Sequence, residues 1–494
     1  MKTKRLHVIW TVVIACLLLA SAGWGGVWTY ASQLTIPKRV TVVVAGKTPG
    51  QSLHGGAVIP IGTMSAEEAK QMLTSRKQAL EQLSVTIKGG PGKGQTKTWT
   101  LSELGLAVDT KETLAAIDRL GSGDIWAKAK YRWRFPQRLA IGVSFDKAVF
   151  TGKVRSEWGW MDAGEPVNAT RKITEQDKVV YTPHQDAYRL DTDRMYASAV
   201  AAINRTIGGD WGTAPTAMTW PVELRVVHPN VTLQRLKDEG IDRLITSFTT
   251  EFKTSGVGRA YNVTVTAKTL HDWELAPGEI FDYGKIISLT NDKYGFREAP
   301  VILNGEFVPG IGGGICQVSS TLYNAALLAG LDMVERRNHS LPVAYLPLGR
   351  DATFADDAIN FRFKNTTGKH LIIRTAVKDR ELTVKLFGTM PKNVSYSLES
   401  KTVATVVPPV KEVPKEDVLP GERRLIAEGK PGFIVETYRI KLEDGAQVSR
   451  KRISRDTYKA QPVMYAVSKE DGAGQGGGSK EEQQEPLLED GVVQ

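Results

Sequence analysis

The stretch GGGICQVSSTLYNAALLAG, residues 312–330, places three glycines directly before a run with helical spacing. Val318 and Leu322 begin an apolar stripe that repeats with the period of a helix, and Gly330 follows as the C-terminal cap. Glycines without side chains allow the backbone to approach a neighbour closely. The stretch therefore predicts one central helix whose first turn carries Cys316.

The N-terminus has the pattern of a membrane segment. Basic residues within the first five precede a stretch without charge, from Val8 to Pro37, which opens with VIWTVVIACLLLASAGWGGVW. Roughly 20 apolar residues span a bilayer, and basic flanks favour the cytoplasmic side. We therefore expect a single-pass anchor over residues 1–31, with the bulk of the chain on the extracytoplasmic side of the membrane. A cleaved signal peptide is the alternative, because ASA at 20–22 resembles a cleavage site.

The two cysteines fall on different sides of this boundary. Cys16 lies in the apolar segment, which leaves Cys316 as the single thiol of the exported part, where it has no intramolecular partner. The N-terminus of a helix stabilises a thiolate, and N–H groups of a glycine turn can hold an oxyanion. Cys316 is thus a candidate nucleophile, with Gly313, Gly314 and Gln317 on the oxyanion side.

The alternative is that Cys316 is a small core residue, since free cysteines are often buried. On a helical wheel, however, Cys316 falls opposite the apolar stripe, near Ser320 and Tyr323. This placement favours a reactive thiol over a packed one.

A thiolate nucleophile needs a base and a group that orients it. His339 is the nearest histidine after the helix, and Asp351 is the first choice to hold its imidazole, with Asp357 and Asn360 as alternatives. Three arginines are candidates to receive substrate carboxylates, although such residues are more often simply solvated: Arg336, Arg337 and Arg350. We expect no metal and no cofactor, because the 7 histidines include no pair at helical spacing and the glycine run lacks the P-loop pattern.

Length and composition indicate several globular domains. The chain has 494 residues, 41% of them hydrophobic, and a net charge of +10 that suits anionic polymers or lipid headgroups. Alternating strand and helix patterns, including a capping box at Ser65 and Glu68, predict an α+β module of two lobes over 36–235. No basic nucleic-acid motif is present in the sequence, so no nucleic-acid partner is expected.

The second half of the chain has a different sequence pattern. Residues 236–390 read as a mixed, β-rich domain of alternating strands around the one helix, and 391–420 as a linker rich in proline, lysine and glutamate. Residues 421–468, with 394 as an alternative start, form a small all-β domain with two strands around a Glu-Asp-Gly turn. Residues 469–494 read as a disordered tail because they lack apolar density. The expected fold class is therefore α+β multidomain with an N-terminal membrane helix.

Three blocks resemble one bacterial family. NVTVTAKTLHDWELAPGEIFDYG, GGGICQVSSTLYNAALLAGLDMVERRNHS and YLPLGRDATFADDAINFRFKN are similar, in order, to the VanW family of envelope proteins, first associated with glycopeptide (vancomycin) resistance. The resemblance covers roughly Arg259 to Thr389; Asp282–Tyr283 replaces a usual Ser-Phe, and Ser320 a usual Thr. The preceding segment resembles a peptidoglycan-binding module, and residues 394–468 are similar to the wall-associated domain named for five glycines.

The resemblance implies a function. Some VanW domains are understood as L,D-transpeptidases with the family's cysteine as nucleophile, which carries that role to Cys316 and the base role to His339. The partners would be peptidoglycan stem peptides, with the membrane held through the N-terminal helix. We expect a cysteine acyltransferase that cross-links stem peptides. The alternatives are a non-catalytic wall-binding or scaffold protein, of the antibiotic-resistance accessory type, and a peptidase that transfers the acyl group to water.

Overall fold

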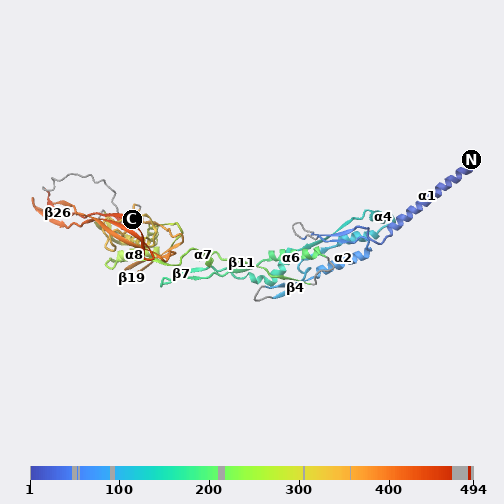
Figure 1. The fold of residues 1–494 in the computed structure, drawn as a ribbon, viewed down its shortest axis with the longest axis horizontal. Helices are drawn as coiled ribbons and strands as arrows, with labels where there is room; N and C mark the ends of the chain where they lie inside the picture. The colour runs from blue at the N-terminus through green and yellow to red at the C-terminus, as the bar shows by residue number, and fades with distance from the viewer. Residues whose placement is uncertain are drawn as a thin grey trace. The chain divides into compact units, whose positions relative to one another are not determined.

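The computed structural model describes residues 2–46, 53, 56–89, 95–209, 217–303, 306–356, 358–469 and 488–490 (Figure 1). The chain divides into two compact units: the first comprises Met1–Val167 and Gln185–Pro229, and the second comprises Asn168–His184 and Asn230–Gln494. Many small sheets, an N-terminal apolar helix and a C-terminal all-β region confirm the α+β multidomain class in outline.

The first helix, α1 (Lys2–Ala31), coincides with the predicted apolar segment. Its part from Leu6 to Ala31 has a mean hydropathy of 2.2, and it is long and apolar enough to cross a membrane. Near the end of α1, Trp24 packs edge-on against Trp126 of α4 (Ile125–Trp133), with ring centroids 5.7 Å apart.

The first unit combines short sheets with capped helices. Ser65 and Glu68 form the predicted capping box at the start of α2 (Ala66–Glu81), and Asp191 caps α6 (Thr192–Gly208). The other helices described there are α3 (Lys111–Asp118), α5 (Lys147–Trp158) and two 3₁₀ turns, Arg119–Gly121 and Gly159–Asp162. The strands are β1 (Thr41–Gly46), β2 (Val58–Pro60), β3 (Ser84–Lys88), β4 (Thr96–Thr100), β5 (Leu106–Asp109), β6 (Arg138–Phe145), β9 (Ala187–Leu190), β10 (Ala217–Pro221) and β11 (Leu224–Val227).

The two lobes expected in this region share one core. Its sheets have the orders β2-β1-β6-β5, β10-β3-β4 and β11-β9, and β3 from the first half pairs in parallel with β10 from the second. A single cluster of buried side chains runs from Ile36 to Val222. The hairpin of β7 (Thr170–Ile173) and β8 (Val179–Thr182), which lies inside the expected module, belongs to the second unit.

The second unit is built around α10 (Ile315–Leu328), the predicted central helix. It packs against α8 (Val257–Leu270) and a sheet of order β12-β20-β19-β13. Gly330, with φ of 76°, ends the helix as predicted, and the Leu331 N–H donates to Ala326 O, five residues back. The strands of this sheet are β12 (Arg243–Glu251), β13 (Trp273–Leu275), β19 (Leu371–Lys378) and β20 (Glu381–Gly388).

The expectation of a single helix among the strands of 236–390 is wrong at two segments, because α8 and α9 (Tyr283–Tyr294) are further helices. Val263, Ala267 and Leu270 follow each other at helical spacing and are buried in the core. The threonines between them hydrogen-bond to the carbonyl four residues earlier, as Thr266 does to Asn262 O. The β-branched residues, which favour strands, therefore sit in a helix stabilised by tertiary packing.

Short elements complete this part of the second unit. They are α7 (Leu233–Asp238), β14 (Ile280–Asp282), β15 (Glu298–Leu303), β16 (Glu306–Ile311), β17 (Asp332–Glu335) and β18 (Arg362–Lys364). Strands β14, β18 and β17 form one sheet, and β15 and β16 form an antiparallel hairpin that leads into the glycine turn.

The C-terminal region is all β, but it starts earlier than 421. The expected linker, 391–420, contains β21 (Val394–Val406) and β22 (Val410–Lys415), which pair with β24 (Gly432–Glu443) and β26 (Val463–Ser468). The predicted hairpin is present as β24 and β25 (Ala446–Tyr458), with positive φ at Asp444 and Gly445 in the turn. Strand β23 (Arg423–Ala427) joins β26 on the other side.

The tail expected to be disordered contains one described segment. Leu488 and Glu489 form β27, which pairs antiparallel with β15. Asp490 follows this strand, and the rest of 470–494 lies outside the described residues.

Candidate functional site

The glycine turn is shaped by close backbone contacts. A Cβ on Gly313 would lie 2.4 Å from Pro300 O, so no side chain fits there without a shift of the backbone. Gly314 has φ of 107°, in the region that favours glycine, and its carbonyl starts α10. Gly313 thus allows the turn to lie against β15, and Gly314 allows it to lie against α8.

Cys316 lies in this first turn and is fully buried, with 0% of its surface exposed. Its Sγ accepts a hydrogen bond from Phe354 N at 3.1 Å and lies 3.4 Å from Phe354 O, to which the thiol can donate. Every residue of α10 from Ile315 to Leu327 is buried, so the side opposite the apolar stripe is covered as well. The expectation that Cys316 faces a less packed side is therefore wrong: helix and sheet cover one side, and β21 and the segment around Phe354 cover the other.

Burial raises the pKa of the Cys316 thiol well above its ordinary value, and the neighbouring Asp490 carboxylate raises it further. The hydrogen bond from Phe354 N acts in the opposite direction. In this arrangement the thiol is protonated at neutral pH.

Asp490 places a carboxylate on the N-terminus of α10. Its Oδ1 accepts from Cys316 N at 2.7 Å, and its Oδ2 accepts from Gly314 N at 3.1 Å. The Gln317 N–H, which was expected to face an oxyanion, donates instead to Gly314 O at 3.1 Å. Two N–H groups of the turn, on Gly314 and Cys316, therefore act as the anion-binding donors.

His339 and Asp351 form a buried pair, as the sequence predicted. Asp351 Oδ2 accepts from His339 Nδ1 at 2.8 Å and from His339 N at 2.7 Å. Asp351 Oδ1 accepts from the Tyr458 hydroxyl, and Arg336 lies 3.6 Å from the same oxygen. His339 Nε2 is buried and has no hydrogen-bond partner among the described residues.

Asp351 and His339 shift each other's pKa in opposite directions. Burial opposes ionisation of Asp351, but the hydrogen bond and charge of His339, with Arg336, lower its pKa to about 2. Burial lowers the pKa of His339, and the hydrogen bond and charge of Asp351 outweigh this and raise it.

The tail also links the pair to the cysteine. Among the described residues, no hydrogen bond joins Cys316 Sγ to His339. The charges of Asp490 and Glu489 raise the pKa of both side chains, and Glu489 accepts from Ser340 N at 2.9 Å and from its hydroxyl at 3.0 Å. The acidic tail residues therefore lie between the cysteine and the histidine loop.

The candidate arginines differ in their surroundings. Arg336 is buried and pairs with Asp456 at 2.5 Å, while Arg350 donates to Leu398 O at 2.6 Å in β21. Arg337 is exposed, and its carbonyl accepts from Thr353 N. Of the alternatives to Asp351, Asp357 lies outside the described residues. Asn360 donates to Asp282 Oδ1 at 2.7 Å.

Several residues of the site carry no motif that sequence reasoning could have used. Asn262 donates to Gly313 O at 3.0 Å, and the Tyr283 hydroxyl donates to Ile315 O at 2.6 Å, so both brace the glycine turn. Arg259 donates to Gln317 Oε1 at 2.7 Å. Their contacts join segments far apart in the sequence, and only the block pattern around Arg259 marked the region.

A pocket of about 640 Å³ opens beside the cysteine segment, since Phe354 lines it. Its other lining groups are mostly charged or polar, among them Asp282, Lys285, Glu335, Asp356 and Arg362.

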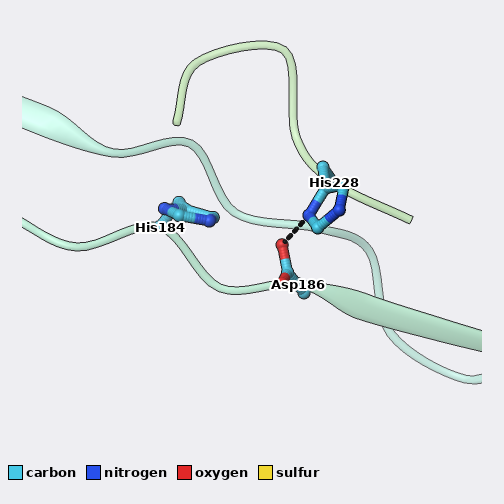
Figure 2. Close-up of side chains that lie close together, drawn as sticks. All are labelled: His184, Asp186 and His228. Atoms are coloured by element: carbon cyan, nitrogen blue, oxygen red, sulfur yellow. Dashed lines mark hydrogen bonds and ion pairs between the residues drawn. The ribbon is translucent and has the colours of Figure 1, made fainter. Parts of the chain in front are cut away.

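Two of the histidines outside this region, His184 and His228, are drawn with Asp186 in Figure 2. In the first unit, His228 Nδ1 lies 2.8 Å from Asp186 Oδ1. In the second unit, His184 Nδ1 accepts from Leu233 N at 3.1 Å. The expectation of no metal stays a prediction.

Comparisons with known proteins identify the domains. The VanW like protein family model matches residues 258–387, and the G5 domain model matches residues 399–469. Among solved structures, an IgA1 protease G5 domain is 22% identical over 16% of this chain and 96% of its own, with a TM-score of 0.13. The G5 domain of HP0197 is 18% identical over 15% of this chain and 97% of its own, with a TM-score of 0.11.

Two curated relatives cover longer parts of the chain. Vancomycin B-type resistance protein VanW of Enterococcus faecalis (strain ATCC 700802 / V583) is 23% identical over 153 residues, 30% of this chain and 56% of the relative. Uncharacterized protein YoaR of Bacillus subtilis (strain 168) is 33% identical over 225 residues, 46% of this chain and 70% of YoaR. With this coverage and the family match around Cys316, the chain belongs to the VanW-like protein family.

Proposed function

We propose that this chain is a membrane-anchored protein of the cell envelope whose VanW domain is a cysteine acyltransferase, an L,D-transpeptidase acting on peptidoglycan stem peptides. One observation carries the proposal: the N–H groups of Gly314 and Cys316 hold a carboxylate beside the Cys316 thiol. A tetrahedral oxyanion needs the same donors at the same place.

The location rests on other features. An apolar helix at the N-terminus is long enough to anchor the chain, and a G5 domain together with a VanW domain supports a cell-wall-associated function. The enterococcal relative is named as a vancomycin resistance protein, which is consistent with a role in the cell envelope. This location is what supports peptidoglycan as the substrate, because the contacts of the Gly314 and Cys316 N–H groups specify only negative charge.

The reaction begins with transfer of the acyl group to sulfur. The Cys316 thiol transfers its proton to the His339 imidazole, and the resulting thiolate attacks the carbonyl carbon of the third stem residue. The carbonyl electron pair moves to the oxygen, which the Gly314 and Cys316 N–H groups hold. When the tetrahedral intermediate collapses, the bond to the terminal D-alanine breaks. The leaving amine takes a proton from His339 Nε2, the ring nitrogen that is not bound to Asp351.

The second half transfers the acyl group to an amine. A neutral amine of a neighbouring stem peptide attacks the thioester, gives its proton to His339, and expels the Cys316 thiolate. The pocket beside Phe354, with carboxylates at Asp282, Glu335 and Asp356, suits the ammonium form of this acceptor before it loses its proton.

The remaining residues have supporting roles in this proposal. Gly313 and Gln317 shape the turn that aims the N–H donors, Asp351 orients His339, and Arg350 positions the loop that carries Asp351 through its contact with β21. Arg337, which is exposed, is the arginine available to a substrate carboxylate.

The test uses the full chain in detergent with a defined disaccharide-tetrapeptide. The expected result is release of D-alanine, a Cys316 acyl adduct detected by mass spectrometry, and cross-linked dimers, all lost in Cys316→Ala. Shortened peptides without dimers would indicate hydrolysis instead of transfer. If neither D-alanine nor an adduct forms, even with the tail variants described below, the catalytic proposal is wrong.

A non-catalytic wall-binding or scaffold protein is the second candidate, favoured by the complete burial of Cys316. It predicts that Cys316→Ala leaves sedimentation with purified sacculi and any cellular phenotype unchanged. Loss of the phenotype in Cys316→Ala, with sedimentation intact, would exclude it.

A further inference from the structure

The C-terminal segment Leu488–Asp490 lies against the first turn of α10 and against Phe354. Strand β27 adds to β15 with Ile302 opposite Glu489, while β16 pairs with the other edge of β15. An extended segment from the end of the chain thus completes a three-stranded sheet next to the glycine turn. This is the geometry of peptide recognition by strand addition.

Both acidic side chains of the segment are buried and hydrogen-bonded. Asp490 and Glu489 are only 8% and 6% exposed. The Asp490 carboxylate takes the two N–H donors at the start of α10, and its own N–H donates to Phe354 O at 3.3 Å. The Glu489 carboxylate takes both donors of Ser340.

These contacts define a ligand chemistry. The edge of β15 opposite β16 binds an extended backbone, and the N-terminus of α10 binds one carboxylate. Ser340 binds the carboxylate of the preceding residue in the bound segment. Buried, charge-assisted hydrogen bonds of this kind need a ligand that brings negative charge, because neutral side chains would leave the donors poorly matched.

We propose that the β15 edge and the N–H groups of Gly314 and Cys316 form a binding site for an extended, carboxylate-bearing peptide, which the chain's own Leu488–Asp490 segment fills in cis, closing off Cys316. The segment stands where the acyl donor would bind, a statement that rests on the proposed function. Release of the segment uncovers the sulfur and removes the adjacent negative charge. The helix terminus and the Phe354 N–H then remain to stabilise a thiolate.

The accessibility of Cys316 tests this proposal without any need for catalysis. In the full chain, alkylation by iodoacetamide is followed by peptide mass spectrometry, which separates Cys316 from Cys16. Asp490→Asn and a variant lacking 488–494 should both react at least about tenfold faster than the wild type, since charge-assisted hydrogen bonds hold the segment. Asp292→Asn, an exposed carboxylate on α9, is the matched control and should react at the wild-type rate.

A peptide added in trans tests the site itself. The synthetic peptide LLEDG should slow alkylation of the shortened variant, and LLENG should do so much less. If Asp490→Asn and the deletion react like the wild type, or if LLEDG gives no protection, the proposal is wrong. Faster alkylation of Cys316 without D-alanine release would instead support the peptide site and refute the acyltransferase.

Discussion

Replacing Asp351 with asparagine should cost the second unit about 3–5 kcal/mol. The carboxylate is fully buried and accepts from His339 at two atoms and from Tyr458, with Arg336 at 3.6 Å. Asparagine cannot accept at both of its terminal atoms, and its neutral side chain removes the negative charge that lies beside His339 and Arg336. Removal of one partner from a buried ion pair costs about this much.

The pKa of Asp351 supports the same order of magnitude. It falls from 3.8 to about 2 in the folded chain. At about 1.36 kcal/mol per pKa unit, the ionised carboxylate contributes about 2.5 kcal/mol. The substitution removes this contribution and also leaves donors without an acceptor.

Hydrogen exchange of the α10 amides in the full chain is the appropriate assay, because it reports the opening of the second unit separately from the first. The opening free energy at pH 7 should fall by about 3–5 kcal/mol in Asp351→Asn. Asp292→Asn makes the same chemical change at an exposed site and should shift it by less than about 0.5 kcal/mol. A loss below about 1 kcal/mol in Asp351→Asn would refute the view that this buried carboxylate balances charge.

Three further outcomes are expected. Gly313→Ala should destabilise the second unit by about 1–3 kcal/mol, because its Cβ would lie 2.4 Å from Pro300 O. The control is Gly152→Ala, which lies in open space within α5 and should be neutral or stabilise the first unit; hydrogen exchange in each unit measures both effects. Tyr458→Phe removes the hydroxyl between Asp351 and Gly349 N and should cost about 1–3 kcal/mol in the same assay. Since the pKa of Asp351 is lowered, its stabilisation is complete above pH 3.8 and is lost as the pH falls toward 2; equal acid sensitivity of wild type and Asp351→Asn would contradict this.

Local signals in the sequence predicted the elements whose causes are local. The capping box at Ser65, the helix that begins at Ile315 and the turn at Gly445 all depend on residues close together in the chain. Helix α8 was missed because its valines and threonines also suit a strand, and only packing against the core selects the helix. Strand β21 was missed because most of its residues are exposed, so no buried face marks it, and pairing with β24 holds it in place.

The candidate site was likewise predictable only where its contacts are local in the sequence. His339 and Asp351 are 12 residues apart, and their pairing could be proposed from proximity and chemistry. The Asp490 carboxylate reaches Cys316 across 174 residues, and no periodicity in the sequence reports such a contact. The wheel argument for Cys316 failed for a related reason, since it treats a helix as having one covered side and α10 is covered all round.

The hydrogen bonds and ion pairs around Asp351 join residues of the two matched domains. Tyr458 and Asp456 lie within the G5 match, and their partners Asp351 and Arg336 lie within the VanW match. A VanW fragment that ends at residue 387 would keep Asp351 and Arg336 but lose their partners Tyr458 and Asp456. A G5 domain from another protein could replace this one only if it supplied a phenol and a carboxylate at the positions of Tyr458 and Asp456. In this chain the two matched domains therefore share one buried network.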